Sequence, residues 1–332
     1  MVVFLAALYG GLTMLQEKNV FPAPVAEQVQ VLLDTTGDAA RKAGAGLRSV
    51  WRNSKAALNE QLRKFGRSLS GSGQEKQNIP VDGELLVDYI DVGQGDCTLI
   101  RQGDSAMLFD CGPDDKGTYL QNYLKKLGIT RLDYVIGSHP DEDHIGSMDV
   151  ILEKFDCDTI FMSDYVKNTK TYNHVTEALK YRNYSAMTPK TGSEWSLGDA
   201  QFTVLGPVQA HEDANDNSIA IRLTYGSTSF LFTGDAEEAE ENDLLSWGND
   251  LKSDVYQAGH HGSSDASSAS FLRKVQPSFT VISCGIDNDY GHPHKKTLQR
   301  LLAAESQILR TDLSGTIRFR SDGTNLSYEA EW

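Results

Sequence analysis

The ten residues from Ser138 to Ser147 (SHPDEDHIGS) bring four potential metal ligands into six positions, directly after an apolar run. The ligand candidates are His139, Asp141, Asp143 and His144. The apolar run, Leu132 to Gly137, is typical of a buried strand, so the ligands fall on the loop at the strand's carboxyl end. Imidazole and carboxylate groups suit zinc, manganese or iron(II), and the lack of thiolates argues against a closed structural zinc site. A single His-x-Asp pair would indicate only a solvated turn, but four ligands predict a metal site.

This stretch resembles the His-x-(His/Asp)-x-Asp-His signature of the metallo-β-lactamase fold, with Asp141 in the second ligand position where many members carry His. That variant resembles the branch containing the hydrolase domain of ComEC competence proteins and the phosphorylcholine esterases. The segments Val92 to Asp96 (VGQGD) and Phe109 to Gly112 (FDCG) resemble the start of the ComEC hydrolase domain. Gly93 and Gly95 suit a tight backbone path near the site. The resemblance covers about 85–301 and implies an α/β (α+β) fold, a four-layer αββα sandwich.

Three later motifs follow in the family's order. Asp235 ends the apolar run of Phe230 to Phe232 and matches the family's bridging aspartate, although a lone Asp there would be a helix cap. The His260-His261-Gly262-Ser263 segment resembles a family motif in which one histidine binds metal and the other faces substrate. We favour His261 as the ligand, but the sequence leaves the order open. His292, in Tyr-Gly-His-Pro, would contact a phosphoryl oxygen or the first metal, unless it is simply a surface histidine.

One position departs from the wider family, in which many members supply a third-motif histidine. The matching segment here holds Asn215, Asp216 and Asn217, and His211 lies slightly upstream. The ComEC branch shares this pattern. The family binds two metal ions, and this segment would supply a ligand to the first of them. That ion would therefore have a weaker oxygen ligand, which favours manganese or a loosely held zinc.

The resemblance therefore implies two divalent metal ions, zinc or manganese. The expected metal ligands are His139, Asp141, Asp143, His144, Asp235 and His261. A water shared by the two cations would lose a proton near neutral pH and attack phosphorus or a carbonyl carbon. The expected catalytic residues are His260, His292 and Asp143, with the histidines offsetting charge on the oxygens of the reacting group.

The chain divides by composition into three parts. Residues 1–16 contain no charged residue and form a marginal membrane anchor, a signal segment or a buried helix. Residues 17–80 hold a basic amphipathic helix, Arg41 to Arg67, with eight basic residues and one acid, and a Gly/Ser-rich linker. Residues 81–332 form the hydrolase domain. This helix could lie on a membrane surface, contact nucleic acid or pack on its own protein.

Within the domain, apolar runs predict an opening antiparallel meander of strands at 85–92, 97–101 and 106–110. Further strands are predicted at 132–137, 159–162, 200–205, 219–223, 230–232 and 279–283, and helices at 116–127, 145–155 and 174–184. The four cysteines lack the spacing of a zinc site and are read as core residues, with a Cys97–Cys111 disulfide as the alternative in an extracytoplasmic domain.

The sequence predicts a phosphodiesterase or nuclease with single-stranded DNA as the favoured substrate, by analogy with the ComEC-like proteins. The alternatives are a phosphorylcholine-type esterase acting on cell-envelope phosphodiesters and a non-catalytic membrane-surface protein. Net charge is −15, which weakens any attraction of nucleic acid by the overall field. We expect a membrane-associated or extracytoplasmic protein, with residues 1–67 contacting the membrane and a cytoplasmic location as the alternative. The oligomeric state stays open.

Overall fold

The structure is a computed structural model that describes residues 83–331 of the chain. The predicted apolar segment (1–16) and the predicted basic helix and linker (17–80) lie outside the described residues. Residues 83–331 form an eight-stranded and a seven-stranded sheet. No helix in this part of the chain has the length and apolar character needed to cross a bilayer.

The first sheet joins the start and the end of the described residues. Its strands, in spatial order, are β15 (Leu326–Ala330), β14 (Ile317–Ser321), β1 (Leu85–Tyr89), β2 (Thr98–Gln102), β3 (Ser105–Phe109), β4 (Arg131–Gly137), β5 (Asp156–Met162) and β6 (Ala186–Met187). β1, β2 and β3 pair antiparallel, which confirms the predicted meander. From β3 to β6 the pairing is parallel, so β4 delivers the His139 to His144 loop at the carboxyl edge of a parallel sheet.

The second sheet has the same mixed character. Its strands, in spatial order, are β13 (Gln307–Arg310), β12 (Phe279–Ile282), β11 (Val255–Gln257), β10 (Thr228–Phe232), β9 (Ala220–Tyr225), β8 (Ala200–Gly206) and β7 (Glu194–Leu197). Strands β7 to β10 pair antiparallel, whereas β10 to β13 pair parallel. The carboxyl ends of β10 and β11 therefore lie at one edge.

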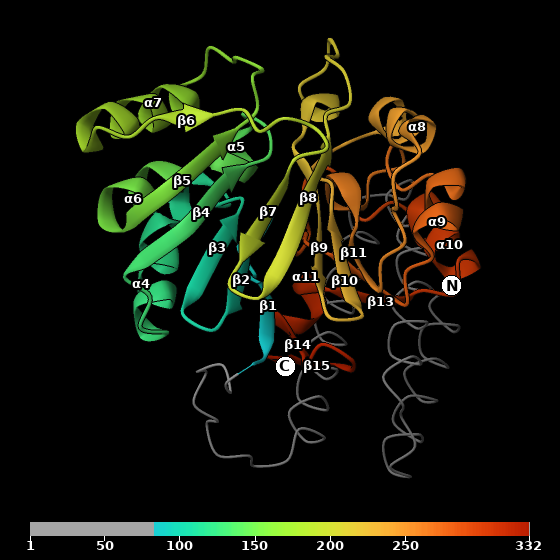
Figure 1. Cartoon of the computed structure of the whole chain (residues 1–332). Helices are drawn as coiled ribbons and strands as arrows, with labels where there is room; N and C mark the ends of the chain where they lie inside the picture. Colours follow the sequence, from blue (N-terminus) through green and yellow to red (C-terminus); the bar gives the residue numbers. More distant parts are fainter. Residues whose placement is uncertain (1–82, 332) are drawn as a thin grey trace, which may run out of the picture. The chain divides into compact units, whose positions relative to one another are not determined.

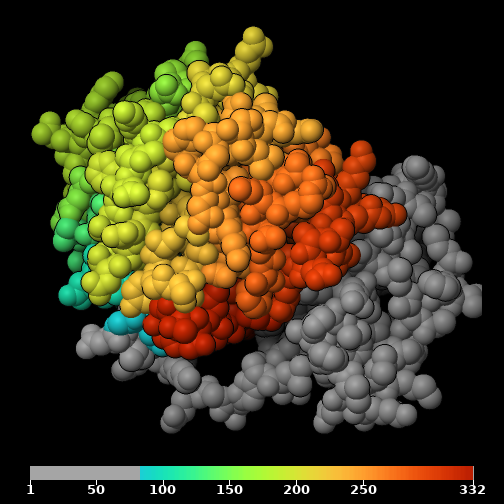
Figure 2. Space-filling model, turned by 45° about the vertical axis from the view of Figure 1, so that its right-hand side comes forward, coloured from blue at the N-terminus to red at the C-terminus, as the bar shows by residue number. Residues whose placement is uncertain are grey.

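Helices cover the outer face of each sheet (Figure 1). The longer helices are α4 (Gly117–Lys126), α6 (Met148–Lys154) and α7 (Lys170–Arg182) beside the first sheet, and α8 (Glu238–Trp247), α9 (Ala269–Val275) and α10 (Lys295–Ala303) beside the second. Two short helices are α5 (Glu142–Ile145) and α11 (Thr311–Ser314), and three 3-10 turns are η1 (Asp114–Lys116), η2 (Asn215–Asn217) and η3 (Gly259–Gly262). The orange and red C-terminal segments form one continuous outer face (Figure 2). This arrangement confirms the predicted αββα sandwich.

The core between the two sheets is aromatic. Phe109 of β3 and Phe232 of β10 have ring centroids 5.5 Å apart, and Tyr89 stacks on Phe232 at 6.0 Å. A second apolar cluster, which includes Leu120 of α4 and Ile151 of α6, lies between the first sheet and its helices. Burying each large apolar side chain contributes about 1.5–3 kcal/mol, so these layers hold the strand ends in place.

Two expectations are corrected. The predicted helix at 145–155 is divided, because α5 ends at Ile145 and α6 begins only at Met148. Gly146, between them, packs so closely that a Cβ there would lie 2.3 Å from the backbone nitrogen of Asp114. The alternative Cys97–Cys111 disulfide is wrong, since both residues are buried thiols without a disulfide. All four cysteines are buried, which confirms the prediction that they are core residues.

Candidate metal centre

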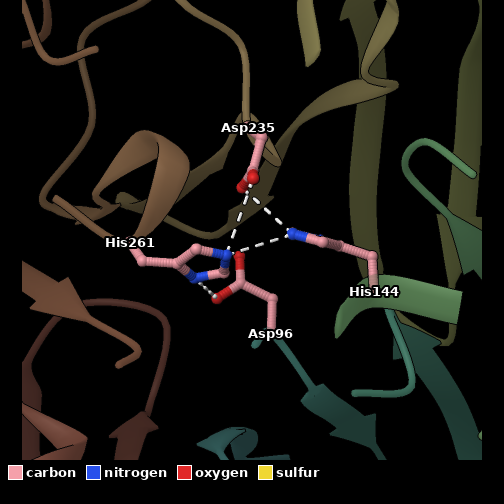
Figure 3. A group of neighbouring side chains, drawn as sticks. All are labelled: Asp96, His144, Asp235 and His261. Atoms are coloured by element: carbon pink, nitrogen blue, oxygen red, sulfur yellow. Dashed lines mark hydrogen bonds and ion pairs between the residues drawn. The ribbon is translucent and has the colours of Figure 1, made fainter. Parts of the chain in front are cut away.

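Side chains from both sheets meet at one edge of the sandwich. His144 lies in α5, after β4 of the first sheet, and Asp96 lies in the loop between β1 and β2. Asp235 follows β10 and His261 lies in η3, after β11, both in the second sheet. Their ligand atoms lie within 4.8 Å of one another, and all four residues are buried. Figure 3 shows the four side chains pointing toward a common centre.

The two imidazoles in this cluster are oriented alike. His144 Nδ1 lies 2.9 Å from Asp110 Oδ2, and His261 Nδ1 lies 3.0 Å from the carbonyl oxygen of Ser283. These acceptors hold the Nδ1–H tautomer and leave each Nε2 facing inward, which is the arrangement usual for metal-binding histidines. The two Nε2 atoms are 3.3 Å apart, and His144 Nε2 is 3.1 Å from Asp235 Oδ1.

Asp143 joins this cluster from the motif loop. Its Oδ2 lies 3.2 Å from His261 Nε2. Its backbone oxygen accepts a 3.1 Å hydrogen bond from the backbone nitrogen of Asp96. Gly95 makes this approach possible, because its φ is +135° and a Cβ there would lie 2.4 Å from the Asp143 backbone oxygen. The predicted tight path of the glycine loop is therefore confirmed, and it carries Asp96 into the site.

His139 and Asp141 lie beside the cluster but outside its tight group. His139 Nε2 is 3.9 Å from Asp235 Oδ2, and its Nδ1 lies 3.1 Å from Ser138 Oγ. Asp141 instead accepts a 2.5 Å hydrogen bond from Lys167 Nζ. His139 therefore lies near Asp235, whereas Asp141 forms an ion pair with a lysine.

His260 and His261 face the same carboxylate from adjacent positions. His260 Nε2 is 3.7 Å from Asp235 Oδ2, and its Nδ1 is 2.8 Å from Glu237 Oε1. The side chain of His260 is 24% exposed and that of His261 is 1% exposed. His261 thus belongs to the buried group and His260 lies at its more exposed side, while their roles as ligand and substrate contact stay predictions.

The third-motif segment serves other contacts. Asp216 Oδ1 accepts hydrogen bonds from the backbone nitrogens of Glu237 and Glu240 at the start of α8. Asn217 Nδ2 donates to the backbone oxygen of His211, while Asn215 Nδ2 donates to Glu237 Oε1. None of these third-motif residues belongs to the His144 cluster within the described part of the chain.

His211 lies in a separate group. Its Nε2 is 3.2 Å from Glu240 Oε2 and 3.0 Å from Asp243 Oδ2. His211 therefore contacts two carboxylates of α8 and lies outside the group formed by Asp96, His144, Asp235 and His261.

His292 lies next to His260, with ring centroids 5.3 Å apart. It is buried, and its Nδ1 has no hydrogen-bond partner among residues 83–331. Burial, together with the nearby His261, lowers the pKa of His292 to about 3. The ring is therefore a neutral group beside His260, and its contact with substrate stays a prediction.

The charges within the cluster are strongly coupled. Burial acts to lower the pKa of His144 and His261, but the surrounding carboxylates, Asp235 foremost, raise both pKa values well above the usual range. Burial acts to raise the pKa of Asp235, yet His144 and His261 hold it well below its usual value. Burial, with His144 close by, lowers the pKa of His139 to about 4.

The donor set fits a divalent cation. Both Asp96 carboxylate oxygens and His139 Nε2 are buried and lack a hydrogen-bond partner within the described residues. Buried carboxylates without partners are costly, and a cation in their midst would satisfy them. Sequence reasoning missed Asp96 as a ligand candidate. The VGQGD segment was the available signal, but it was interpreted only as the start of the hydrolase domain and as a tight backbone path near the site.

An αββα sandwich with a histidine and aspartate site at the edge shared by its two sheets is the architecture that the resemblance implied. The family model described as Metallo-beta-lactamase superfamily matches residues 90–286, and the chain belongs to this superfamily.

Among curated proteins, the chain is 31% identical over 254 residues to ComE operon protein 3 from Bacillus subtilis, covering 70% of this chain and 33% of that protein. It is also 31% identical over 254 residues to Competence protein ComA from Neisseria gonorrhoeae, covering 76% and 34%. The chain thus spans about a third of the length of these relatives. The predicted likeness to ComEC-type competence proteins is confirmed.

Among solved structures, the metallo-beta-lactamase fold protein YhfI from Bacillus subtilis has a TM-score of 0.50 at 14% identity, covering 72% of this chain and 100% of that one. This likeness supports the fold. Superfamily membership and the buried cluster together support a metal-dependent hydrolase that binds divalent metal.

Proposed function

We propose that this chain is a metal-dependent phosphodiesterase whose favoured substrate is single-stranded DNA. The observation that carries the proposal is the convergence of two inward-facing imidazole Nε2 atoms and several carboxylates in one buried cluster. Its likeness to proteins named for competence supports nucleic acid as the substrate class. Asp141, where β-lactam and lactone hydrolases carry His, favours a phosphoryl over a carbonyl substrate.

We assign the ligands to two divalent ions, zinc or manganese. Asp96, Asp143, His144, Asp235 and His261 would hold one ion, and His139, Asp141 and Asp235 the other. When bound, such ions lower the pKa of water toward neutrality and neutralise charge on a phosphoryl group. Asp96 is an addition to the ligands expected from the sequence.

The histidines outside the cluster contact the substrate in this proposal. Glu237 holds His260 Nδ1, so the His260 ring is fixed with Nε2 toward the reacting group. Burial acts to lower the pKa of His260, but the hydrogen bond to Glu237 raises it above the usual value. In this protonated form both ring nitrogens donate, so Nε2–H gives a hydrogen bond to a non-bridging phosphoryl oxygen. His292 borders the same space beside His260. Hydrogen bonds of this kind stabilise charge that develops during attack.

Metal content and hydrolysis measured together test the proposal. Purified full-length protein would be assayed with bis-p-nitrophenyl phosphate and labelled single-stranded DNA, with and without manganese. We expect Asp143→Ala to lose bound metal and at least 100-fold in both activities. Asp199→Ala, in the exposed turn between β7 and β8, is the matched control and should match wild type.

Each outcome separates the candidate functions. Cleavage of the small diester without DNA cleavage would favour the phosphorylcholine-type esterase, which p-nitrophenylphosphorylcholine would then test directly. The acidic lining near Asp141 and Asp143 favours this phosphorylcholine-type esterase as the second candidate, because the choline group is positively charged. Protein without bound metal and without hydrolysis would favour the non-catalytic membrane-surface protein.

We also propose that residues 1–67 associate with a membrane, in an extracytoplasmic or membrane-associated protein. Retention of the full-length chain in the membrane fraction after a high-salt wash would support an apolar anchor. Release by salt alone would point to the basic helix, because its attraction to anionic lipids is screened.

A further inference from the structure

A cleft of about 520 Å³ opens next to the proposed metal ligands. Its wall runs from Asp141 and Asp143 in the motif loop, past Gly93 in the glycine loop, to Tyr290 in the loop between β12 and α10. A cleft of this volume falls in the range that accepts a small organic group such as a nucleoside. A substrate whose reacting phosphate lies at the metal ligands would place its neighbouring group here.

Tyr290 is an aromatic ring exposed at the mouth of this site. It is 65% exposed, although its ring stacks on His292 with centroids 5.6 Å apart and an interplanar angle of 21°. One face is thus supported by a buried histidine of the site, and the rest of the ring is open to the cleft.

The loop that carries Tyr290 is held by its own hydrogen bonds. Asn288 Nδ2 donates to the backbone oxygens of Gly285 and His292, and Asn288 Oδ1 accepts from the backbone nitrogen of His292. His294 Nε2 lies 3.2 Å from the backbone oxygen of Tyr290. The ring is therefore pre-organised, which lowers the entropy cost of stacking a ligand on it.

The charge of the cleft limits what it can attract. Four carboxylates line it (Asp115, Asp141, Glu142 and Asp143), against Lys116 and Lys167. Both lysines already pair with carboxylates, Lys116 with Asp115 and Lys167 with Asp141. Charge alone therefore does not favour a polyanion here, so affinity must come from another contact.

A choline head group fits the cleft less well than a base. Recognition of a quaternary ammonium uses a cage of several aromatic rings, and Tyr290 is the one aromatic residue lining the cleft within the described chain. A flat base needs one supported ring, because stacking uses a single face.

We propose that this cleft binds the base of the nucleotide next to the scissile phosphodiester, stacked on Tyr290. This inference rests on the proposed phosphodiesterase function and names the part of the substrate that gives affinity. Stacking requires a base that is not paired in a duplex, so Tyr290 would select single-stranded over double-stranded nucleic acid.

Binding of paired oligonucleotides to the full chain tests the proposal. The probes are a fluorescent phosphorothioate oligothymidylate, chosen because it resists cleavage, and an abasic oligomer of the same length and charge, both with manganese. We expect wild type to bind the base-bearing probe about tenfold more tightly than the abasic one, the effect of roughly one base stack. Tyr290→Ala should abolish this preference, and Tyr290→Phe should keep it.

Tyr181→Ala is the matched control, because Tyr181 is 79% exposed near the C-terminal end of α7 and does not line the cleft. It should bind both probes as wild type does. Equal affinity of wild type for the two probes, no binding of either, or a preference that survives Tyr290→Ala would each overturn the proposal.

Parallel hydrolysis of bis-p-nitrophenyl phosphate separates this proposal from the proposed function. If wild type hydrolyses the diester but shows no base preference, the proposed phosphodiesterase function is supported and the proposed base-binding cleft is contradicted. A Tyr290-dependent base preference without diester hydrolysis would support the proposed base-binding cleft and contradict the proposed phosphodiesterase function. Tyr290-dependent hydrolysis of p-nitrophenylphosphorylcholine, with no base preference, would assign the cleft to a choline head group instead.

Discussion

Asp96 shows at the scale of one residue why this site favours a cation. Its carboxylate is 1% exposed, and neither oxygen has a hydrogen-bond partner in the described structure. His261 Nδ1 lies 3.4 Å from Oδ1, but the same nitrogen is committed to the carbonyl of Ser283. A buried carboxylate so poorly satisfied costs a few kcal/mol, roughly, which metal binding would recover.

Replacing Asp96 by Asn should weaken metal binding while leaving the metal-free protein at least as stable. The amide keeps the size of the side chain and removes the unsatisfied charge. We expect about tenfold weaker binding of manganese, the loss of one weak carboxylate ligand being worth about 1.4 kcal/mol. Calorimetric titration and thermal unfolding in chelator measure the two effects.

The exposed Asp104, in the turn between β2 and β3, supplies the control variant Asp104→Asn. Unchanged manganese affinity in Asp96→Asn would remove Asp96 from the ligand set.

Lys167 should compete with metal for Asp141, because its ammonium group already holds that carboxylate. Both side chains are partly exposed, so the pair is worth only about 1 kcal/mol or less. We therefore expect Lys167→Ala to tighten binding of a second equivalent of manganese by about threefold to fivefold. Calorimetric titration resolves the two equivalents, with Lys180→Ala on α7 as the control. Weaker binding of the second equivalent would show that Lys167 supports the site.

Individual site residues could be predicted where several metal-binding side chains stand close together in the sequence. His144 and Asp143 stand in a dense motif, and Asp235 and His261 each follow a strand, so spacing and order revealed them. Asp96 is brought in by a backbone contact with Asp143, which lies 47 positions further along the chain, and no local pattern encodes this contact.

Helix α8 is the element whose role differs most from the sequence reading. Asp216, expected near the first metal, accepts hydrogen bonds from two backbone nitrogens at the start of α8 and acts as its cap. A short Asn/Asp segment can cap a helix or bind metal, and local sequence does not separate the two. α8 also buries two of its own carboxyl groups, Glu240 and Glu241.

Glu240 should make stability depend on pH. Burial raises its pKa to about 8, above the usual value near 4.5. The unfolded chain therefore releases this proton at a lower pH than the folded protein does. The stability that the protonated Glu240 contributes is complete below about pH 4.5 and is lost as the pH rises through about 8. We expect Glu240→Gln to exceed wild type by about 2 kcal/mol in unfolding free energy at pH 9 and to match it at pH 5.

Urea unfolding in chelator at pH 5, 7 and 9 measures this difference. Glu241, whose pKa burial raises to about 7, keeps a residual slope in both proteins. The exposed Glu238 gives the control variant Glu238→Gln, which should follow wild type. A Glu240→Gln protein that loses stability at pH 9 as steeply as wild type would contradict the assignment.

At the scale of the whole molecule, the sequence predicted the layers but not how the strands are ordered. Apolar runs revealed β1 to β5, β8 to β10 and β12, because their residues are buried on at least one face. Strand β14 pairs with β1 from the opposite end of the described chain. Such long-range pairing depends on the complementary surface of a distant partner, so the sequence did not predict β14. The short or partly exposed strands β6, β7, β11, β13 and β15 were not predicted either.

The metal site lies where the two sheets meet, so an ion there would link them. Asp96 and His144 come from the first sheet, and Asp235 and His261 from the second. An ion bound at this point favours the folded state, by about 2.7 kcal/mol when its concentration is 100 times its dissociation constant. For a domain of this size, that corresponds to a rise of about 5–10 °C in melting temperature.

This stabilisation should depend on pH because protons compete with metal. In the metal-free protein the pKa values of His144 and His261 are raised well above the usual range, so both imidazoles hold protons that a metal must displace. Metal affinity should therefore rise with pH, and the shift in melting temperature caused by manganese should be largest near pH 8 and nearly absent at pH 5.5. Thermal unfolding at fixed manganese across this range measures it, with His261→Ala as the variant that should show no shift. An equal shift at both pH values would mean that these two imidazoles are not the groups that bind the ion.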